Sequence, residues 1–176
     1  MVEKIRRVVT GHDDSGKSVF ICDGDAGAVM EMESMPGLAL TDLWVTDSSP
    51  ADNIGNTDAT DRPIVLEPPA NGTIFRVVEF PPDSAWRDNA DAKEAFGSIG
   101  ADHATDDSSD DAMMHKTSTV DYLIVLKGEI WAILDDSETC LKQGDVMVQR
   151  GTNHSWSVRT NEPCLLAAIL VDSTPV

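Results

Sequence analysis

Hydrophobic and polar positions alternate along the chain in many short segments, and turn residues separate one segment from the next. Alternation of this kind places successive side chains on opposite faces, as in a half-buried strand. It predicts strands over residues 4–10, 18–23, 38–45, 73–80, 129–134, 139–142, 146–148, 155–159 and 164–171. Many short strands joined by regular turns are typical of a β-sandwich or a β-barrel. We therefore expect an all-β fold.

Four segments depart from this alternation. Residues 46–61 contain mostly Asp, Ser, Asn, Gly and Thr, which predicts a surface loop. Residues 88–96 are compatible with one or two helical turns, and residues 102–111 form an acidic segment that we expect to be mobile. This acidic segment lacks the ligand spacing and the central glycine of an EF-hand calcium loop. The run 164–171 is apolar throughout, which indicates a strand buried on both faces.

The length of 176 residues fits one domain. Within residues 1–176 we expect residues 1–72 to form an N-terminal extension of strands and loops, and residues 73–176 to form a barrel. The extra strands would lengthen the sheets or cross to a partner subunit, because an exposed strand edge invites pairing. A homodimer is the expected assembly.

The charge narrows the choice of partners. The chain carries 31 acidic and 13 basic residues, a formal net charge of −18. This balance opposes binding to nucleic acid and to anionic membrane surfaces. The three cysteines, Cys22, Cys140 and Cys164, are far apart and form no CxxC motif. Without a signal peptide pattern or an apolar run of membrane-spanning length, we expect a cytoplasmic location and a small-molecule partner.

The candidate chemistry lies between residues 114 and 156. If residues 115–121 form a strand, His115 and Asp121 point to the same side, and His154 could converge on them from a later segment. Two imidazoles and one carboxylate suit a divalent ion such as Fe, Zn, Mn or Ni, and three protein ligands leave positions open for substrate. The other interpretation is that these are polar side chains satisfied by hydrogen bonds inside a barrel.

Three neighbouring side chains are expected to line a substrate pocket. Thr117 and Thr119 share the predicted face of His115, and Trp156 follows His154 by two residues. Arg76 stands within an apolar strand, where a charge is unusual. It could anchor an anionic ligand or pair with one of the many carboxylates, and we favour the pairing.

The segment from His115 to Gly128 resembles the first signature motif of the cupin superfamily. His115 stands at the position of the first motif histidine, and Asp121 stands where a glutamate is usual. Gly128 follows Asp121 by seven residues, as in the motif. Thr117 occupies the position of the second motif histidine, so one of the usual metal ligands is absent.

The segment from Gly144 to His154 resembles the second motif of the same superfamily. Gly144, Gly151 and His154 match its frame, while Gln149 replaces the usual proline. The resemblance covers the last 70 residues or so closely and the first 75 hardly at all.

This resemblance implies a cupin-type jelly roll or β-barrel with extra N-terminal strands. It also implies a divalent metal ion held by His115, Asp121 and His154. The expected function is a metal-dependent enzyme of the dioxygenase, decarboxylase or isomerase type, a range that includes oxidoreductases. Its substrate would be a small organic molecule with a carbonyl, carboxylate or phenolic oxygen. The alternative, favoured by Thr117, is a cupin without a cofactor that binds a small molecule as a sensor or carrier and catalyses no reaction.

Overall fold

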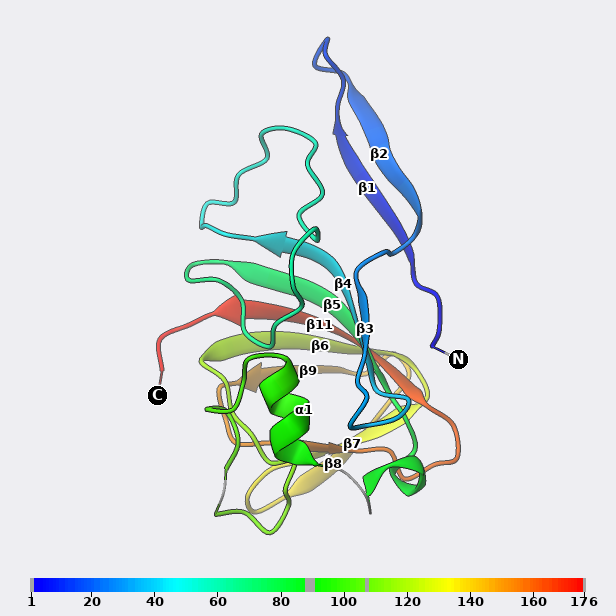
Figure 1. Cartoon of the computed structure of the whole chain (residues 1–176), viewed down its shortest axis with the longest axis vertical. Coiled ribbons are helices and arrows are strands. Elements are labelled where there is room, and N and C mark those ends of the chain that lie inside the picture. Colours follow the sequence, from blue (N-terminus) through cyan, green and yellow to red (C-terminus); the bar gives the residue numbers. More distant parts are fainter. Residues whose placement is uncertain (1, 88–90, 107, 176) are drawn as a thin grey trace.

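The computed structural model of the chain describes residues 2–87, 91–106 and 108–175, and strands dominate it (Figure 1). In chain order the strands are β1 (Arg6–His12), β2 (Ser18–Asp25), β3 (Val29–Glu31), β4 (Ala39–Thr46), β5 (Thr73–Phe80), β6 (Thr119–Lys127), β7 (Glu129–Ile133), β8 (Glu138–Lys142), β9 (Val146–Arg150), β10 (Ser155–Ser157) and β11 (Cys164–Asp172). The fold is all-β, as the alternating pattern predicted.

Two antiparallel sheets build the body of the molecule. The larger has the order β3-β4-β5-β11-β6-β9, and the smaller has the order β10-β7-β8. Apolar side chains of both sheets share one core cluster, in which Ile130 and Leu141 of the smaller sheet join Leu123 and Leu166 of the larger. The two sheets therefore pack face to face, and burial of this apolar surface is the main force that holds them together.

Strands β1 and β2 form an antiparallel hairpin, which projects from the body as a separate two-stranded sheet (Figure 1). An isolated hairpin is marginal in water, so it needs an anchor. Arg7 supplies one, because its side chain is only 8% exposed and its guanidinium bonds to Asp58, to the Thr60 hydroxyl at 3.0 Å and to the Leu43 carbonyl at 3.3 Å.

The strands β3 and β4 extend the larger sheet beyond β5. The sequence pattern predicted β4, whereas it did not predict β3, which has three residues and pairs with β4 from Val29 to Glu31. A register shift between Asp42 and Trp44 bends β4 where it pairs with β5. Residues before position 73 thus contribute two strands to the main sheet.

Two short helices follow β5. The 3-10 helix η1 covers Asp83–Ala85, and α1 covers Ala92–Ser98. Asp91 caps α1 by accepting a hydrogen bond from the Glu94 amide at 3.0 Å. Helical structure was predicted over residues 88–96, of which residues 88–90 lie outside the described residues. Neither helix in the described ranges has the length and apolar composition needed to span a membrane.

The predicted strand over residues 115–121 is interrupted. Strand β6 begins at Thr119, and His115 makes only isolated bridges, to Thr105 and to His154. The cause is pairing with other segments, because the Lys116 amide donates to the Ala104 carbonyl at 2.9 Å and the His115 backbone pairs with His154. His115 and Asp121 therefore do not belong to one continuous strand.

Candidate functional site

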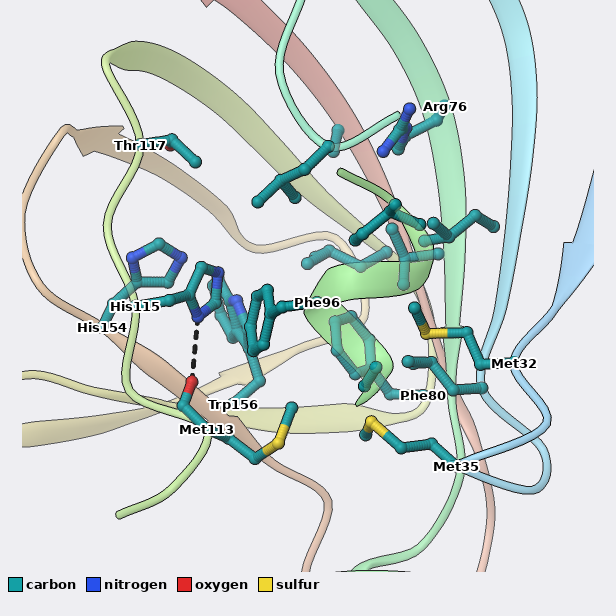
Figure 2. Close-up of a pocket in the computed structure, with 18 of the residues that line it drawn as sticks. Met32, Met35, Arg76, Phe80, Phe96, Met113, His115, Thr117, His154 and Trp156 are labelled. Carbon is teal, nitrogen blue, oxygen red and sulfur yellow. Dashed lines mark hydrogen bonds between the residues drawn. The ribbon is translucent and has the colours of Figure 1, made fainter. Parts of the chain in front are cut away.

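One cavity, of about 130 Å³, contains most of the chemically interesting side chains (Figure 2). Most of its lining is apolar and comes from the β3–β4 region, β5, the helical segment, β6 and β11, with these side chains: Met32, Met35, Leu38, Leu40, Leu66, Val78, Phe80, Trp86, Ala95, Phe96, Ile99, Met113, Leu123, Trp156, Leu166, Ala168 and Leu170. The polar lining consists of Arg76, His115, Thr117, Asp121 and His154. A largely apolar pocket with a few polar groups is typical of a small-molecule site.

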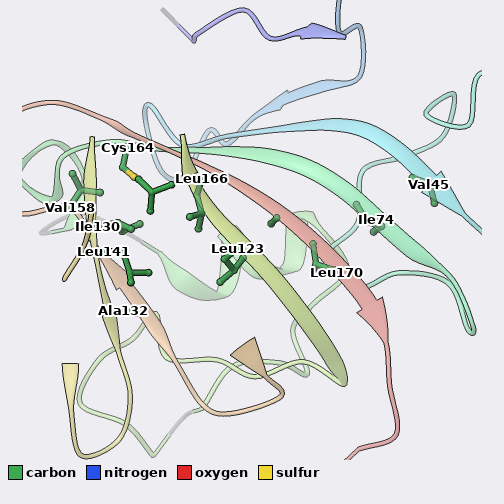
Figure 3. Close-up of a cluster of buried hydrophobic side chains, with 12 residues drawn as sticks. Val45, Ile74, Leu123, Ile130, Ala132, Leu141, Val158, Cys164, Leu166 and Leu170 are labelled. Carbon is green, nitrogen blue, oxygen red and sulfur yellow. The ribbon is translucent and has the colours of Figure 1, made fainter. Parts of the chain in front are cut away.

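The back of the cavity continues into the core between the sheets. Leu123, Leu166 and Leu170 line the cavity and also belong to the shared core cluster (Figure 3). These side chains come from the central strands β6 and β11, which are paired along most of their length. The cavity is therefore built on the most extensively paired part of the fold.

The two histidines meet because their backbones form a small antiparallel bridge. The His115 amide donates to the His154 carbonyl, and the His154 amide donates to the His115 carbonyl, both at 2.9 Å. Their ring centroids lie 4.2 Å apart. Gly151, three residues before His154, has a φ of +59° that favours glycine, and a Cβ there would lie 3.1 Å from the Thr117 carbonyl oxygen.

Both histidines have a defined tautomer. Nδ1 of His115 lies 2.9 Å from the Met113 carbonyl oxygen, and Nδ1 of His154 lies 3.0 Å from the Thr152 carbonyl oxygen. A carbonyl only accepts, so each Nδ1 carries the proton and each Nε2 is a lone-pair donor. Burial lowers the pKa of His115, and burial with repulsion from His115 lowers the pKa of His154 to about 3. Both rings are neutral at physiological pH.

Aromatic rings continue from the histidine pair in both directions. Phe96 of α1 lies 4.8 Å from the His115 ring, measured between centroids. On the other side Trp156 meets His154 edge-on at 5.6 Å, and Phe80 lies 6.1 Å beyond Trp156. These five rings form one wall of the cavity, which would offer flat apolar contacts to a bound molecule.

Asp121 also lines the cavity. Its side chain is 6% exposed, and its Oδ1 is buried without a hydrogen-bond partner in the described structure. Burial raises the pKa of Asp121 to about 6, against the opposing effects of the Thr119 hydroxyl and of the positive charge on Arg76. Its electrostatic partners thus include Arg76 and neither histidine.

Arg76 has the carboxylate partner that the sequence favoured. Its Nε donates to Asp42 Oδ1 at 2.9 Å, and its Nη2 donates to Asp42 Oδ2 at 3.3 Å and to the Val65 carbonyl at 2.6 Å. Asp42 and Arg76 are cross-strand partners on β4 and β5, and both are almost fully buried. Arg76 also lines the cavity, so this pairing does not remove it from the site.

The three ligands predicted for a metal ion are not assembled into one group. Among the described residues, no three His, Cys, Asp or Glu side chains come together in an arrangement that could hold a metal. The donor set that the structure offers is the pair His115 and His154, whose neutral Nε2 atoms are suitable ligands for a divalent ion. Asp121 does not complete a three-residue group with that pair.

The predicted pocket residues have different surroundings. Thr117 and Trp156 line the cavity, as does every predicted metal ligand. Thr119 is 1% exposed and absent from the lining, and its hydroxyl lies 2.7 Å from the Thr117 hydroxyl. Thr117 therefore presents a hydroxyl that is already hydrogen-bonded.

Sequence reasoning missed most of the apolar lining. Met32, Met35, Leu38 and Leu40 lie far before the motif region, and Phe96 lies in the helical segment. The alternation of Leu38 and Leu40 was a signal that both face one side, but nothing local indicated which side faces a cavity. Long-range pairing of β4 with β5 decides that.

Comparison with known proteins gives the family. No family model matches the chain. Phomopsin biosynthesis cluster protein C' of Diaporthe leptostromiformis is 32% identical over 164 residues, which cover 88% of this chain and 71% of that protein. Cupin-domain-containing oxidoreductase virC of Hypocrea virens is 28% identical over 180 residues, which cover 97% and 77%. The chain belongs to the cupin superfamily.

The solved structures that resemble the chain are more distant in sequence. The cupin domain of Cnp3 from Schizosaccharomyces pombe is 13% identical, with 98% of this chain and 86% of that chain covered and a TM-score of 0.44.

Proposed function

We propose that the chain is a cupin enzyme of the oxidoreductase class that binds a small organic molecule in the cavity described above. One observation carries the proposal, namely that two neutral histidines lie side by side in the wall of a largely apolar cavity. The name of the virC relative, a cupin-domain-containing oxidoreductase, supports the reaction class. The substrate class is a molecule with an apolar body and a carbonyl, carboxylate or phenolic oxygen.

The histidine pair is the reactive end of the proposed site. Each Nε2 can accept a hydrogen bond from a substrate hydroxyl, because the proton resides on Nδ1. The same two nitrogens would hold a divalent ion such as Fe, Zn, Mn or Ni, and such an ion would polarise a substrate oxygen and stabilise negative charge on it. The carbonyls of Met113 and Thr152 keep both rings in the tautomer that either role requires.

The rest of the lining would bind and orient the substrate. Phe96 and Trp156 offer ring faces and edges beside the histidines. Met32, Met35 and Met113 supply flexible side chains that adapt to the shape of an apolar group. Together these side chains would exclude water from the substrate oxygen, which strengthens every electrostatic interaction there.

A second candidate function is a metal-free cupin that binds a small molecule as a sensor or carrier. Two observations favour it. Asp121 stands apart from the histidine pair, and the hydroxyl of Thr117, at the motif position of a histidine, is engaged by Thr119. In that case the histidines would serve as hydrogen-bond acceptors alone.

Metal content separates the two functions. We would measure it by mass spectrometry on protein purified without chelator or affinity tag, for the wild type, His115→Ala and His154→Ala. A matched control is His103→Ala, because His103 is exposed and pairs with Glu67 at 2.9 Å outside the cavity. The enzyme proposal predicts near-stoichiometric metal in the wild type and the control, and its loss in the two cavity variants.

Two results would contradict the metal-dependent enzyme. Metal that persists in both His115→Ala and His154→Ala would show that the pair does not hold it. The absence of metal from the wild type, even after incubation with Fe(II), Mn(II), Ni(II) and Zn(II), would favour the ligand-binding function instead.

A further inference from the structure

The cavity contains a second polar region, formed by Asp121 and Arg76. In Figure 2 Arg76 lies on the opposite side of the displayed lining from His115 and His154. Asp121 and Arg76 attract one another, whereas the electrostatic partner of His154 is His115. Asp121 and Arg76 therefore form a pair of charges that is distinct from the histidine pair.

Asp121 is an acceptor in need of a donor. Its Oδ1 has no hydrogen-bond partner in the described structure, although the side chain is 94% buried. An unsatisfied buried acceptor is costly and rare in native proteins. Its cross-strand neighbour Gln149 does not supply the donor, because the Gln149 amide nitrogen donates to both the Thr152 carbonyl, at 3.1 Å, and the Thr152 hydroxyl, while its oxygen is itself unpaired.

Arg76 has donor capacity left over. Its Nε and Nη2 bond to Asp42 and to the Val65 carbonyl, while no hydrogen bond within the described residues reaches Nη1. A guanidinium carries five N–H donors, so this group remains incompletely used. The region therefore combines one free acceptor with at least one free donor.

The charges of the region restrict the group that could bind there. One cation, Arg76, faces two carboxylates, those of Asp42 and Asp121, which leaves an excess of one negative charge. An anionic ligand such as a carboxylate would be repelled, since Asp42 already neutralises the arginine. A hydroxyl is neutral, and it both donates and accepts, so it satisfies both unpaired groups.

We propose that Asp121 and Arg76 form a subsite for a neutral hydroxyl of the bound molecule, phenolic or alcoholic, separate from the histidine pair. This inference rests on the proposed function, in that the cavity is taken as the substrate site. The ligand is then an organic molecule whose hydroxyl donates to Asp121 Oδ1 and accepts from Arg76 while its apolar body fills the cavity. Asp121 acts as a specificity-determining residue and is not a metal ligand.

Three probes with the same 4-butylphenyl body test the subsite by titration calorimetry: 4-butylphenol, 4-butylanisole and 4-butylbenzoate. The first has the hydroxyl, the second lacks its proton, and the third carries a charge. We expect the phenol to bind about tenfold or more tightly than the anisole, and the benzoate to bind most weakly. A preference for benzoate, or equal binding of phenol and anisole, would overturn the hydroxyl subsite while leaving the cavity as a binding site.

Variants test whether Asp121 causes the tighter binding of the phenol. In Asp121→Leu the phenol and the anisole should bind within about twofold of one another, whereas Asp136→Leu, which removes an exposed carboxylate between β7 and β8, should keep the wild-type preference. Asp121→Asn, which preserves the side-chain shape, should retain the metal content of the wild type. Loss of metal in Asp121→Asn would show that Asp121 is a metal ligand. That result would overturn the proposal that Asp121 serves a hydroxyl subsite apart from the histidine pair. If no probe binds to the wild type, the organic-substrate site fails, and the subsite fails with it.

Discussion

The unpaired carboxylate of Asp121 has a measurable effect on stability. Burial raises its pKa from 3.8 to about 6, so the folded state holds this proton more tightly than the unfolded state does. Stability is therefore lost as pH rises from about 4 through 6. The difference between the two pKa values corresponds to roughly 3 kcal/mol of unfolding free energy.

Replacing Asp121 with asparagine removes this titration. We expect Asp121→Asn to be about 2–3 kcal/mol more stable than the wild type at pH 7.5, and the gain to vanish below pH 4. Urea unfolding at both pH values, with EDTA present, measures it. An equal gain at the two pH values would show that ionisation of Asp121 is not the cause.

His154 titrates with the opposite sign. Its pKa is lowered from 6.5 to about 3 by burial and by repulsion from His115, so the unfolded state binds the proton more tightly. Stability is then lost as pH falls from 6.5 towards 3. We expect His154→Gln to lose about 2–3 kcal/mol less than the wild type between pH 7 and 4.5, while His103→Gln follows the wild type. Parallel curves for all three proteins would contradict the burial of a neutral His154.

The sequence predicted part of this site. The motif spacing placed His115 and His154 in one region, and the structure brings their rings together through a backbone bridge. The motif resemblance and the expected strand from His115 placed Asp121 beside them, and the structure puts Asp121 in the same cavity without a three-ligand group. The Lys116 amide bonds to the Ala104 carbonyl, and a contact between segments of this kind leaves no signal in the local alternation.

At the scale of elements, β4 and β5 are joined by a buried ion pair. Arg76 and Asp42 are 2% and 4% exposed, and burial raises the pKa of Asp42 and lowers the pKa of Arg76. Desolvation therefore outweighs the attraction for both partners. The pair contributes less to stability than its short distances suggest. Removing one partner, however, leaves the other charge buried without a partner, which is strongly destabilising.

A double-mutant cycle tests this account. Arg76→Leu should cost about 3–5 kcal/mol of unfolding free energy, because Asp42 remains buried without its partner. The double variant Arg76→Leu with Asp42→Leu should recover most of that loss. Denaturant unfolding of the single and double variants gives the values, and a double variant no more stable than Arg76→Leu alone would contradict the interpretation.

The strands were predicted with unequal success for a physical reason. Strand β5 was found with its observed bounds, and β7 to β11 were found with ends shifted by a residue or two, because an alternating pattern or an unbroken apolar run is a local property of the sequence. The three residues of β3 carry no periodic signal, and their strand exists only because β4 lies beside them. The N-terminal strands join the sheet through such long-range pairing, and this arrangement could not be derived from the sequence.

At the scale of the whole molecule, the outer face of the larger sheet bears a row of apolar side chains. Trp44, Phe75, Ile169, Tyr122 and Val148 are successive register partners across five strands. Tyr122 is 49% exposed and Val148 is 55% exposed. In a chain of net charge −18, an uncharged row is the surface at which a second copy meets the least repulsion.

The homodimer expected from the sequence is therefore predicted to form across this row. Light scattering after size exclusion should give the wild type a mass near twice the 19.0 kDa of one chain. Val148→Asp should lower the measured mass to that of a single chain. The control Ile54→Asp, at a side chain 92% exposed in the loop before β5, should not. A monomeric wild type, or a Val148→Asp dimer, would refute this interface.

The central claim is that the cavity between Asp121 and the histidine pair holds an organic molecule. The most direct test is a crystal structure of the protein grown with 4-butylphenol. We expect the phenol in the cavity, with its oxygen within hydrogen-bonding distance of Asp121 and its butyl group among Met32, Met35 and Phe96. A cavity closed by its own side chains, with the phenol bound elsewhere or absent, would contradict the account.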